Sequence, residues 1–155
     1  MAAVELLPVT VTGPKRILII EDEQVTLLAL AQIVEAAGYN ATTAADGAQA
    51  IKAFESEPPD LILLDINLPG ETFGQQLDGL ALIDWLNYRH PDHKPKYIIV
   101  SGDDPGKHKM RSAVNEAFCF IQKPAEKDLL LAEIRKAIGE PLDSGQPAAD
   151  SPQAC

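Results

Sequence analysis

Short apolar segments alternate along the chain with segments whose apolar residues recur at helical spacing. The short segments predict strands, because an unbroken apolar run suits a strand that is buried on both faces. They span residues 15–20, 39–44, 61–64, 96–100 and 118–122, and the second is the weakest of the set. Strands that alternate with helices predict an α/β fold, with a parallel sheet, right-handed crossovers and helices on both faces.

Five helices are predicted between and after these strands. They span residues 24–37, 46–57, 78–89, 104–115 and 125–138. Gly38 is expected to stop the first helix and Asp46 to cap the second, while Asp104-Pro105 is typical of an N-cap with a first-turn proline. A basic run in the fourth helix is predicted to form a solvated face rather than a docking patch; it consists of Lys107, His108, Lys109 and Arg111.

Polar side chains follow four of the predicted strands. Glu21-Asp22 follows the first strand, Asp65 the third, Ser101 the fourth and Lys123 the fifth. The carboxyl ends of parallel strands share one edge of the sheet, where open α/β folds place their ligand sites. Three carboxylates brought together there require a bound cation or a raised pKa, and oxygen ligands suit Mg²⁺. A magnesium-dependent phosphate site is therefore expected, with a serine and a lysine available to a phosphoryl group.

Length and charge narrow the class of protein. The 155 residues favour one domain, and a composition of 46% hydrophobic and 23% charged residues is that of a globular protein. The 23 acidic residues against 13 basic ones give a net charge of −10, which disfavours binding to nucleic acid or to an anionic membrane. Cys119, in an apolar stretch, and Cys155 are not expected to pair, which fits a cytoplasmic protein.

The chain divides into three predicted parts. Residues 1–14 form an N-terminal extension that lacks the pattern of a secretory signal. Residues 15–138 hold every predicted strand and helix, and no apolar stretch among them is long enough to cross a membrane. Residues 139–155 hold three prolines, three acids and no base, so this acidic, proline-rich tail is predicted to be disordered.

Four motifs occur in order within residues 15–138. They are Ile-Leu-Ile-Ile-Glu-Asp-Glu at 17–23, Leu-Leu-Asp-Ile-Asn-Leu-Pro-Gly at 63–70, Val-Ser-Gly at 100–102 and Phe-Ile-Gln-Lys-Pro at 120–124. They resemble the acidic pair, the phosphorylation site, the Ser/Thr switch position and the aromatic and Lys-Pro motif of CheY-like response-regulator receiver domains, which act in two-component signalling. The resemblance implies a doubly wound, five-stranded parallel sheet in the flavodoxin-like order 2-1-3-4-5, with five helices.

The resemblance also implies a phosphorylation site that needs Mg²⁺. Asp65 would be the nucleophile that takes a phosphoryl group from a phosphohistidine, on a sensor histidine kinase or a histidine phosphotransfer protein. Asp22 and Asp65 would ligate Mg²⁺ directly, together with the backbone carbonyl of Asn67. Glu21 would act largely through a metal-bound water. The metal would neutralise charge on the transferring group, while the protein mainly supplies positioning.

A switch is the second implication of the resemblance. Lys123 would contact the phosphoryl group, and a cis peptide bond before Pro124 would fix the loop that aims it. Ser101 would move to bind the phosphoryl group and Phe120 would change rotamer, so that the new charge biases a two-state surface for an unknown protein target. Such a stand-alone receiver would have no DNA-binding output domain and would assist only its own phosphorylation and dephosphorylation.

The chain departs from the family pattern at three places. Residues 71–77 separate Gly70 from Asp78, where the family usually has a single residue, so six residues are extra. This loop lies beside the predicted site, where it could gate access or select a partner, and a neutral surface insertion is equally open. Glu116 stands where glycine is common before the fifth strand, and Ala125 replaces the usual bulky residue after Lys-Pro.

Other functions are weighed against the phospho-acceptor hypothesis. A receiver that is never phosphorylated could serve as a protein-interaction module, although every key side chain is present. An aspartyl-nucleophile phosphatase would need a second acid where Asn67 stands, since an amide cannot act as an acid and base. A flavin-binding protein would need a hydroxyl- and glycine-rich loop after the first strand, where the chain has three acids instead.

Overall fold

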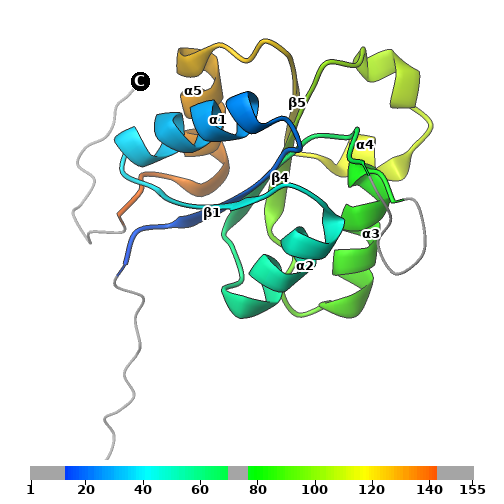
Figure 1. Cartoon of the computed structure of the whole chain (residues 1–155), viewed down its shortest axis with the longest axis horizontal. Helices are drawn as coiled ribbons and strands as arrows, with labels where there is room; N and C mark the ends of the chain where they lie inside the picture. The colour runs from blue at the N-terminus through cyan, green and yellow to red at the C-terminus, as the bar shows by residue number, and fades with distance from the viewer. Residues whose placement is uncertain (1–12, 70–76, 143–155) are drawn as a thin grey trace, which may run out of the picture.

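Five parallel strands form one sheet at the centre of the molecule (Figure 1). The structure is a computed structural model, and it describes residues 13–69 and 77–142. The strands pair in the order β2-β1-β3-β4-β5, which confirms the predicted fold class and order. Each begins or ends within one residue of its predicted bounds; they are β1 (Arg16–Ile20), β2 (Asn40–Ala44), β3 (Leu61–Leu64), β4 (Lys96–Ser101) and β5 (Cys119–Gln122).

Helices cover both faces of the sheet, as the sequence predicted. On one face lie α1 (Gln24–Ala36) and α5 (Lys127–Ile138). On the other face lie α2 (Gly47–Ser56), α3 (Gly79–Arg89) and α4 (Ser112–Glu116) (Figure 1). The sheet is therefore the middle layer of three, and its strands need apolar residues on both sides.

Two apolar clusters, one on each face of the sheet, make up the core. Successive residues of β1 alternate between them: Ile17 and Ile19 pack towards α1 and α5, while Leu18 and Ile20 pack towards α2 and α3. All four are at most 2% exposed, and burial of an aliphatic side chain of this size contributes roughly 2 kcal/mol. The central strands β1 and β3 are thus firmly held, and so are the residues that directly follow them.

Asp46 and Gly38 mark helix ends as predicted, and Asp78 is a further cap that the structure adds. Asp46 accepts a hydrogen bond from the Gln49 N–H at 2.8 Å and begins α2. Asp78 accepts one from the Ala81 N–H at 2.9 Å and begins α3. Gly38 follows α1 with φ of 104°, a left-handed conformation that favours glycine.

The single helix predicted over residues 104–115 is wrong. A 3₁₀ helix, η2 (Pro105–His108), is followed by a break and then by the short α4. Asp104 caps η2 as predicted, through the Gly106 N–H at 3.3 Å. The break falls at Arg111, whose backbone is extended and whose guanidinium donates to both carboxylate oxygens of Asp78 at 3.0 Å. This bidentate pair stabilises a conformation that a continuous helix would not allow.

Asp78 therefore binds two elements: it caps α3 and, through Arg111, holds the start of α4. Burial by itself would raise the pKa of Asp78, but hydrogen bonds from Arg111 and Ala81 outweigh it and hold the pKa below its ordinary value. The carboxylate is thus charged at neutral pH, which the pairing with Arg111 requires.

The two ends of the described domain meet at the amino edge of the sheet. The Lys15 N–H donates to the Pro141 carbonyl at 2.8 Å, and the Tyr39 hydroxyl donates to the Gly139 carbonyl at 2.7 Å. The first residues that the sequence assigned to a disordered tail thus contact the domain.

Three predicted features lie wholly or mostly outside the described residues: the N-terminal extension, the extra loop at 71–77 and the tail, whose residues 143–155 are not described. Within residues 13–69 and 77–142, no helix combines the length and the apolar character needed to cross a lipid bilayer.

Candidate functional site

Backbone hydrogen bonds continue past the strand ends and bring the predicted site residues to one edge of the sheet. Ile20 and Leu64, the last residues of β1 and β3, lie opposite each other, and the Asp65 N–H donates to the Ile20 carbonyl at 3.0 Å. The Lys123 N–H donates to the Ser101 carbonyl at 2.8 Å. The residues that follow four different strands are therefore neighbours, as the sequence predicted.

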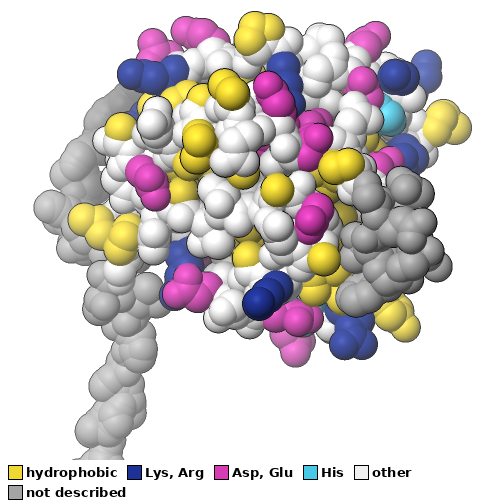
Figure 2. All heavy atoms as spheres, viewed as in Figure 1, with side chains coloured by type: hydrophobic (Ala, Val, Ile, Leu, Met, Phe, Trp, Pro, Cys, Tyr) yellow, Lys and Arg dark blue, Asp and Glu magenta, His cyan; other side chains and the backbone are white. Residues whose placement is uncertain are grey.

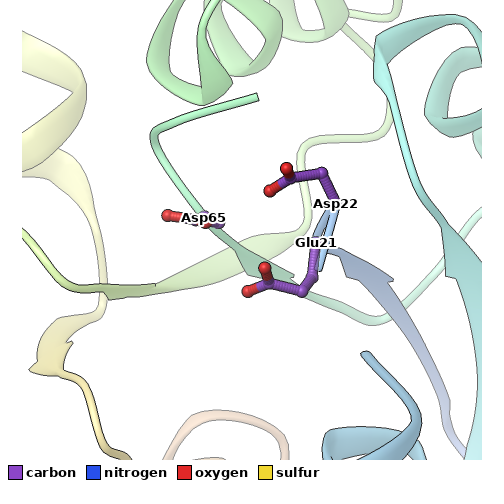
Figure 3. Close-up of side chains that lie close together, drawn as sticks. All are labelled: Glu21, Asp22 and Asp65. Carbon is purple, nitrogen blue, oxygen red and sulfur yellow. The ribbon is translucent and has the colours of Figure 1, made fainter. Parts of the chain in front are cut away.

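Three carboxylates gather at this edge. Glu21, Asp22 and Asp65 each offer an oxygen within 4.8 Å of the others (Figure 3). Glu21 and Asp65 are buried, with 1% and 6% exposure, whereas Asp22 is exposed. Like charges this close repel one another, and a hard cation relieves that repulsion through oxygen ligands. The set of donors fits Mg²⁺, with Asp22 open to solvent and able to admit metal-bound water.

The positively charged side chain of Lys123 contacts two of the three carboxylates. Its Nζ lies 2.6 Å from Glu21 Oε1 and 3.2 Å from Asp65 Oδ2. Burial would lower the pKa of Lys123, but its bonds to these two carboxylates raise the pKa above the ordinary value. The peptide bond between Lys123 and Pro124 is cis, the geometry that the sequence analysis named as a way to aim this lysine.

Glu21 already has a partner on each of its oxygens. Oε1 binds Lys123, and Oε2 accepts the Glu23 N–H at 3.0 Å. Burial nevertheless raises the pKa of Glu21, although the hydrogen bond from Lys123 opposes the shift. Both oxygens of Glu21 thus have protein partners, and its role through a metal-bound water stays a prediction.

Asn67 lies beside the predicted nucleophile. Its backbone N–H donates to Asp65 Oδ1 at 3.3 Å, and its side chain is exposed. Asp65 therefore has one oxygen held by this N–H and the other held by Lys123. Ligation of a metal by the Asn67 carbonyl stays a prediction.

The two predicted switch residues lie on neighbouring strands. Ser101, the last residue of β4, is fully buried, and its Oγ accepts the Asp103 N–H at 3.2 Å. Phe120 of β5 pairs with Ile99 of β4 and packs, partly buried, on the side of the sheet that α3 and α4 cover. Ser101 and Phe120 are thus connected through two adjacent strands, and their movement stays a prediction.

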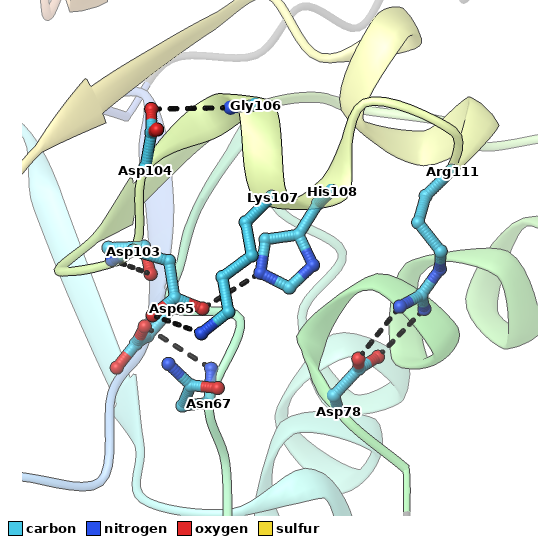
Figure 4. Close-up of polar contacts among 10 residues, drawn as sticks. Asp65, Asn67, Asp78, Asp103, Asp104, Gly106, Lys107, His108 and Arg111 are labelled. Atoms are coloured by element: carbon cyan, nitrogen blue, oxygen red, sulfur yellow. Dashed lines mark hydrogen bonds and ion pairs between the residues drawn. The ribbon is translucent and has the colours of Figure 1, made fainter.

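A second polar cluster near the site, which was not predicted from the sequence, is formed by Asp103, Lys107 and His108. Asp103 lies between the sheet edge and η2, where His108 Nε2 is 2.8 Å from Asp103 Oδ2 and Lys107 Nζ is 3.7 Å from Asp103 Oδ1 (Figure 4). His108 and Arg111 therefore both have acidic partners, so the predicted solvated basic face is wrong for these two. The available signal was an acid two residues beyond Ser101 in the same loop.

Comparison with known proteins decides the family. The family model for the response regulator receiver domain matches residues 17–135, which is most of the chain and includes every residue of the site. The chain belongs to the response-regulator receiver family. The receiver fold and the position of the acidic cluster at the carboxyl edge of the sheet agree with this assignment.

One of the similar curated proteins is a much longer regulator. It is 34% identical over 122 residues to the nitrogen assimilation regulatory protein NtrX of Azorhizobium caulinodans, a match that covers 79% of this chain and 26% of that protein. The chain therefore spans about a quarter of that curated relative.

Two solved structures show the same fold. The CheY-like receiver domain protein of Methanospirillum hungatei has a TM-score of 0.69 and 29% identity, covering 81% of this chain and 94% of its own. The response regulator TrrA of Thermotoga maritima, solved in complex with Mg²⁺ and beryllium fluoride, has a TM-score of 0.67 and 27% identity, covering 79% and 98%.

Proposed function

We propose that this receiver is a phospho-acceptor of a two-component phosphorelay, in which Asp65 takes a phosphoryl group from a phosphohistidine. The observation that carries the proposal is the setting of the Asp65 carboxylate. It is nearly buried, lies among two further acids that together suit Mg²⁺, and contacts the ammonium group of Lys123. A purely structural aspartate would need neither the acidic neighbours nor the lysine.

The reaction needs little from the protein beyond positioning and charge. A carboxylate oxygen of Asp65 attacks phosphorus, the bond from phosphorus to the imidazole nitrogen breaks, and that nitrogen keeps the electron pair. Bound Mg²⁺ supplies neutralisation of the charge on the transferring group. Lys123 and the Asn67 N–H hold the two oxygens of Asp65, and Lys123 is available to stabilise negative charge at the phosphoryl group.

An apolar surface beside the site suits a protein donor. A groove of about 400 Å³ lies next to Lys123 and is lined by side chains that include Val25, Ala29, Ile33 and Pro124. Val25 is 73% exposed at the start of α1, and the neighbouring Leu28 is 51% exposed. A sensor histidine kinase or a histidine phosphotransfer protein could present its phosphohistidine to Asp65 while it covers this surface.

The proposal is tested by the mass of the intact protein after incubation with acetyl phosphate, with Mg²⁺ or with EDTA. We expect one phosphoryl adduct that forms with Mg²⁺ and is lost with EDTA, because the acidic cluster repels the donor when no cation is bound. The absence of an adduct on folded protein would reject the proposal. The receiver would then be a protein-interaction module that works without phosphorylation.

Lys123→Ala is expected to separate metal binding from the response to phosphorylation. The acids that suit Mg²⁺ remain, so binding of Mg²⁺ measured by calorimetry should persist. The change in the NMR signals of Phe120 on phosphorylation should be lost, because no ammonium group links the phosphoryl group to β5. Lys52→Ala on α2, an exposed position, is the matched control. An unchanged Phe120 response in Lys123→Ala would refute this role of the lysine.

A further inference from the structure

Asp103, Lys107 and His108 form a cluster at the mouth of the site, called the mouth cluster below. Asp103 is a fourth acid near Asp65, in the loop that follows β4 (Figure 4). Its carboxylate is engaged by two residues of η2: His108 at 2.8 Å and Lys107 at 3.7 Å. The side chains of Asp103 and His108 are only 17% and 15% exposed, whereas Lys107 is 66% exposed. The contact with His108 is therefore the better shielded of the two.

The mouth cluster is connected to the phosphorylation site on two sides. The Asp103 backbone N–H donates to the Oγ of Ser101, the predicted switch residue. The side chain of Asn67, whose backbone N–H binds Asp65, also stabilises the charged form of Asp103. Hydrogen bonding from His108 is the largest cause that holds the pKa of Asp103 below its ordinary value. Asp103 is thus linked to Asp65 through Asn67 and to the switch position through Ser101.

The Asp103 carboxylate would repel a phosphoryl group on Asp65 unless neighbouring groups hold it in place and offset its charge. Phosphorylation adds a dianion to a region that already holds three acids, and its interaction with a fourth would be repulsive. Lys123 is bound to Glu21 and Asp65, so it is not in contact with Asp103. Two side chains of η2 contact the Asp103 carboxylate instead: the ammonium group of Lys107 and the imidazole of His108.

We propose that His108 is a positioning residue for phosphoryl binding, which acts by holding the Asp103 carboxylate on η2 through a hydrogen bond, while the ammonium group of Lys107 offsets the charge of that carboxylate. The inference rests on the proposed phospho-acceptor function. The 3₁₀ helix η2 would then serve to place two consecutive side chains, Lys107 and His108, against the same carboxylate. The effect of His108 should also depend on Asp103 being an acid.

The test measures binding of beryllium fluoride, a non-covalent mimic of a phosphoryl group, by ¹⁹F NMR at saturating Mg²⁺. His108→Ala should weaken binding roughly tenfold, the scale of one lost hydrogen bond to a charged group. His108→Gln, which can still donate a hydrogen bond to Asp103, should recover most of the loss. Lys109→Ala, an exposed neighbour outside the mouth cluster, is the control and should bind as the wild type does.

The double variant decides between positioning and simple damage to the fold. With Asp103→Asn as the background, His108→Ala should change the affinity by less than about twofold, because no charged carboxylate is left for His108 to hold away from the phosphoryl group. A loss as large as in the wild-type background would overturn the proposal, and so would wild-type affinity in His108→Ala alone. If the wild type binds no beryllium fluoride and takes up no phosphoryl group, the proposed function fails and the inference fails with it.

Discussion

Asp65→Asn is expected to take up no phosphoryl group from acetyl phosphate at any Mg²⁺ concentration. The amide has the shape of the carboxylate but is no nucleophile, so the bond to phosphorus cannot form. The fold should persist, because the substitution removes one of three mutually repelling charges and leaves the bond between Lys123 and Glu21 in place. Intact-protein mass gives the uptake, and thermal unfolding gives the stability.

Asp92→Asn is the matched control for this experiment. Asp92 is an exposed aspartate in the turn between α3 and β4, away from the carboxyl edge of the sheet. This variant should be phosphorylated as the wild type is. Uptake by Asp65→Asn at the wild-type level would show that another side chain is the nucleophile, and peptide mapping of the adduct would then locate it.

Gly79→Ala is expected to lower the stability of the fold strongly, because the added methyl group would clash with backbone atoms near the site. A Cβ on this first residue of α3 would lie 2.1 Å from the Asp65 carbonyl oxygen and 3.1 Å from Ile66 Cα. Both are backbone atoms of the loop that leaves β3, so no side chain can turn aside. The Gly79 N–H also donates to the Ile66 carbonyl at 2.7 Å, which ties α3 to this loop.

We expect Gly79→Ala to lower the free energy of unfolding by roughly 3 kcal/mol, the upper range for overpacking of a buried position. Phosphorylation should slow as well, because any relief of the clash moves the backbone of Asp65. Urea unfolding and the rate of uptake from acetyl phosphate measure the two effects. Gly102→Ala is the control, since a Cβ there meets nothing within 4 Å. Equal stability of the two variants would contradict the expected clash.

The fold was predictable because local pattern and global architecture agree. Leu61–Leu64 is apolar throughout and is buried on both faces of the sheet, as such a run requires. Asp46 and Asp78 mark helix starts through bonds to N–H groups three residues away, and a bond of that span is visible in sequence. The strand order needed the family resemblance, because an alternation of strands and helices does not specify which strands are neighbours.

The acidic site was predictable for a related reason. Residues that directly follow parallel strands must share an edge, so Glu21, Asp65 and Lys123 could be placed together before any contact was known. Their contacts could not be predicted. The pairing of Lys123 with Glu21 at 2.6 Å, closer than its 3.2 Å to Asp65, depends on how each side chain is packed.

Two features could not be predicted from the sequence: the break in the fourth helix and the partner of His108. Arg111 breaks the predicted fourth helix while its side chain binds Asp78, which lies 33 residues earlier in the chain. Helix propensity and cap preferences describe only neighbouring residues, so they favoured a continuous helix there. The partner of His108 is local, five residues earlier at Asp103, but the contact forms only because residues 105–108 turn into a 3₁₀ helix instead of the predicted α-helix.

The contact between the first and last parts of the described domain has a consequence for engineering. The Lys15 N–H and the Pro141 carbonyl are bonded at the amino edge of the sheet, and Asp65 follows β3 at the opposite edge. A short linker between these ends would close the domain into a ring without approaching the acidic cluster. New ends opened at the exposed turn of Pro91 and Asp92 would yield a circular permutant whose chain order differs while its site stays the same.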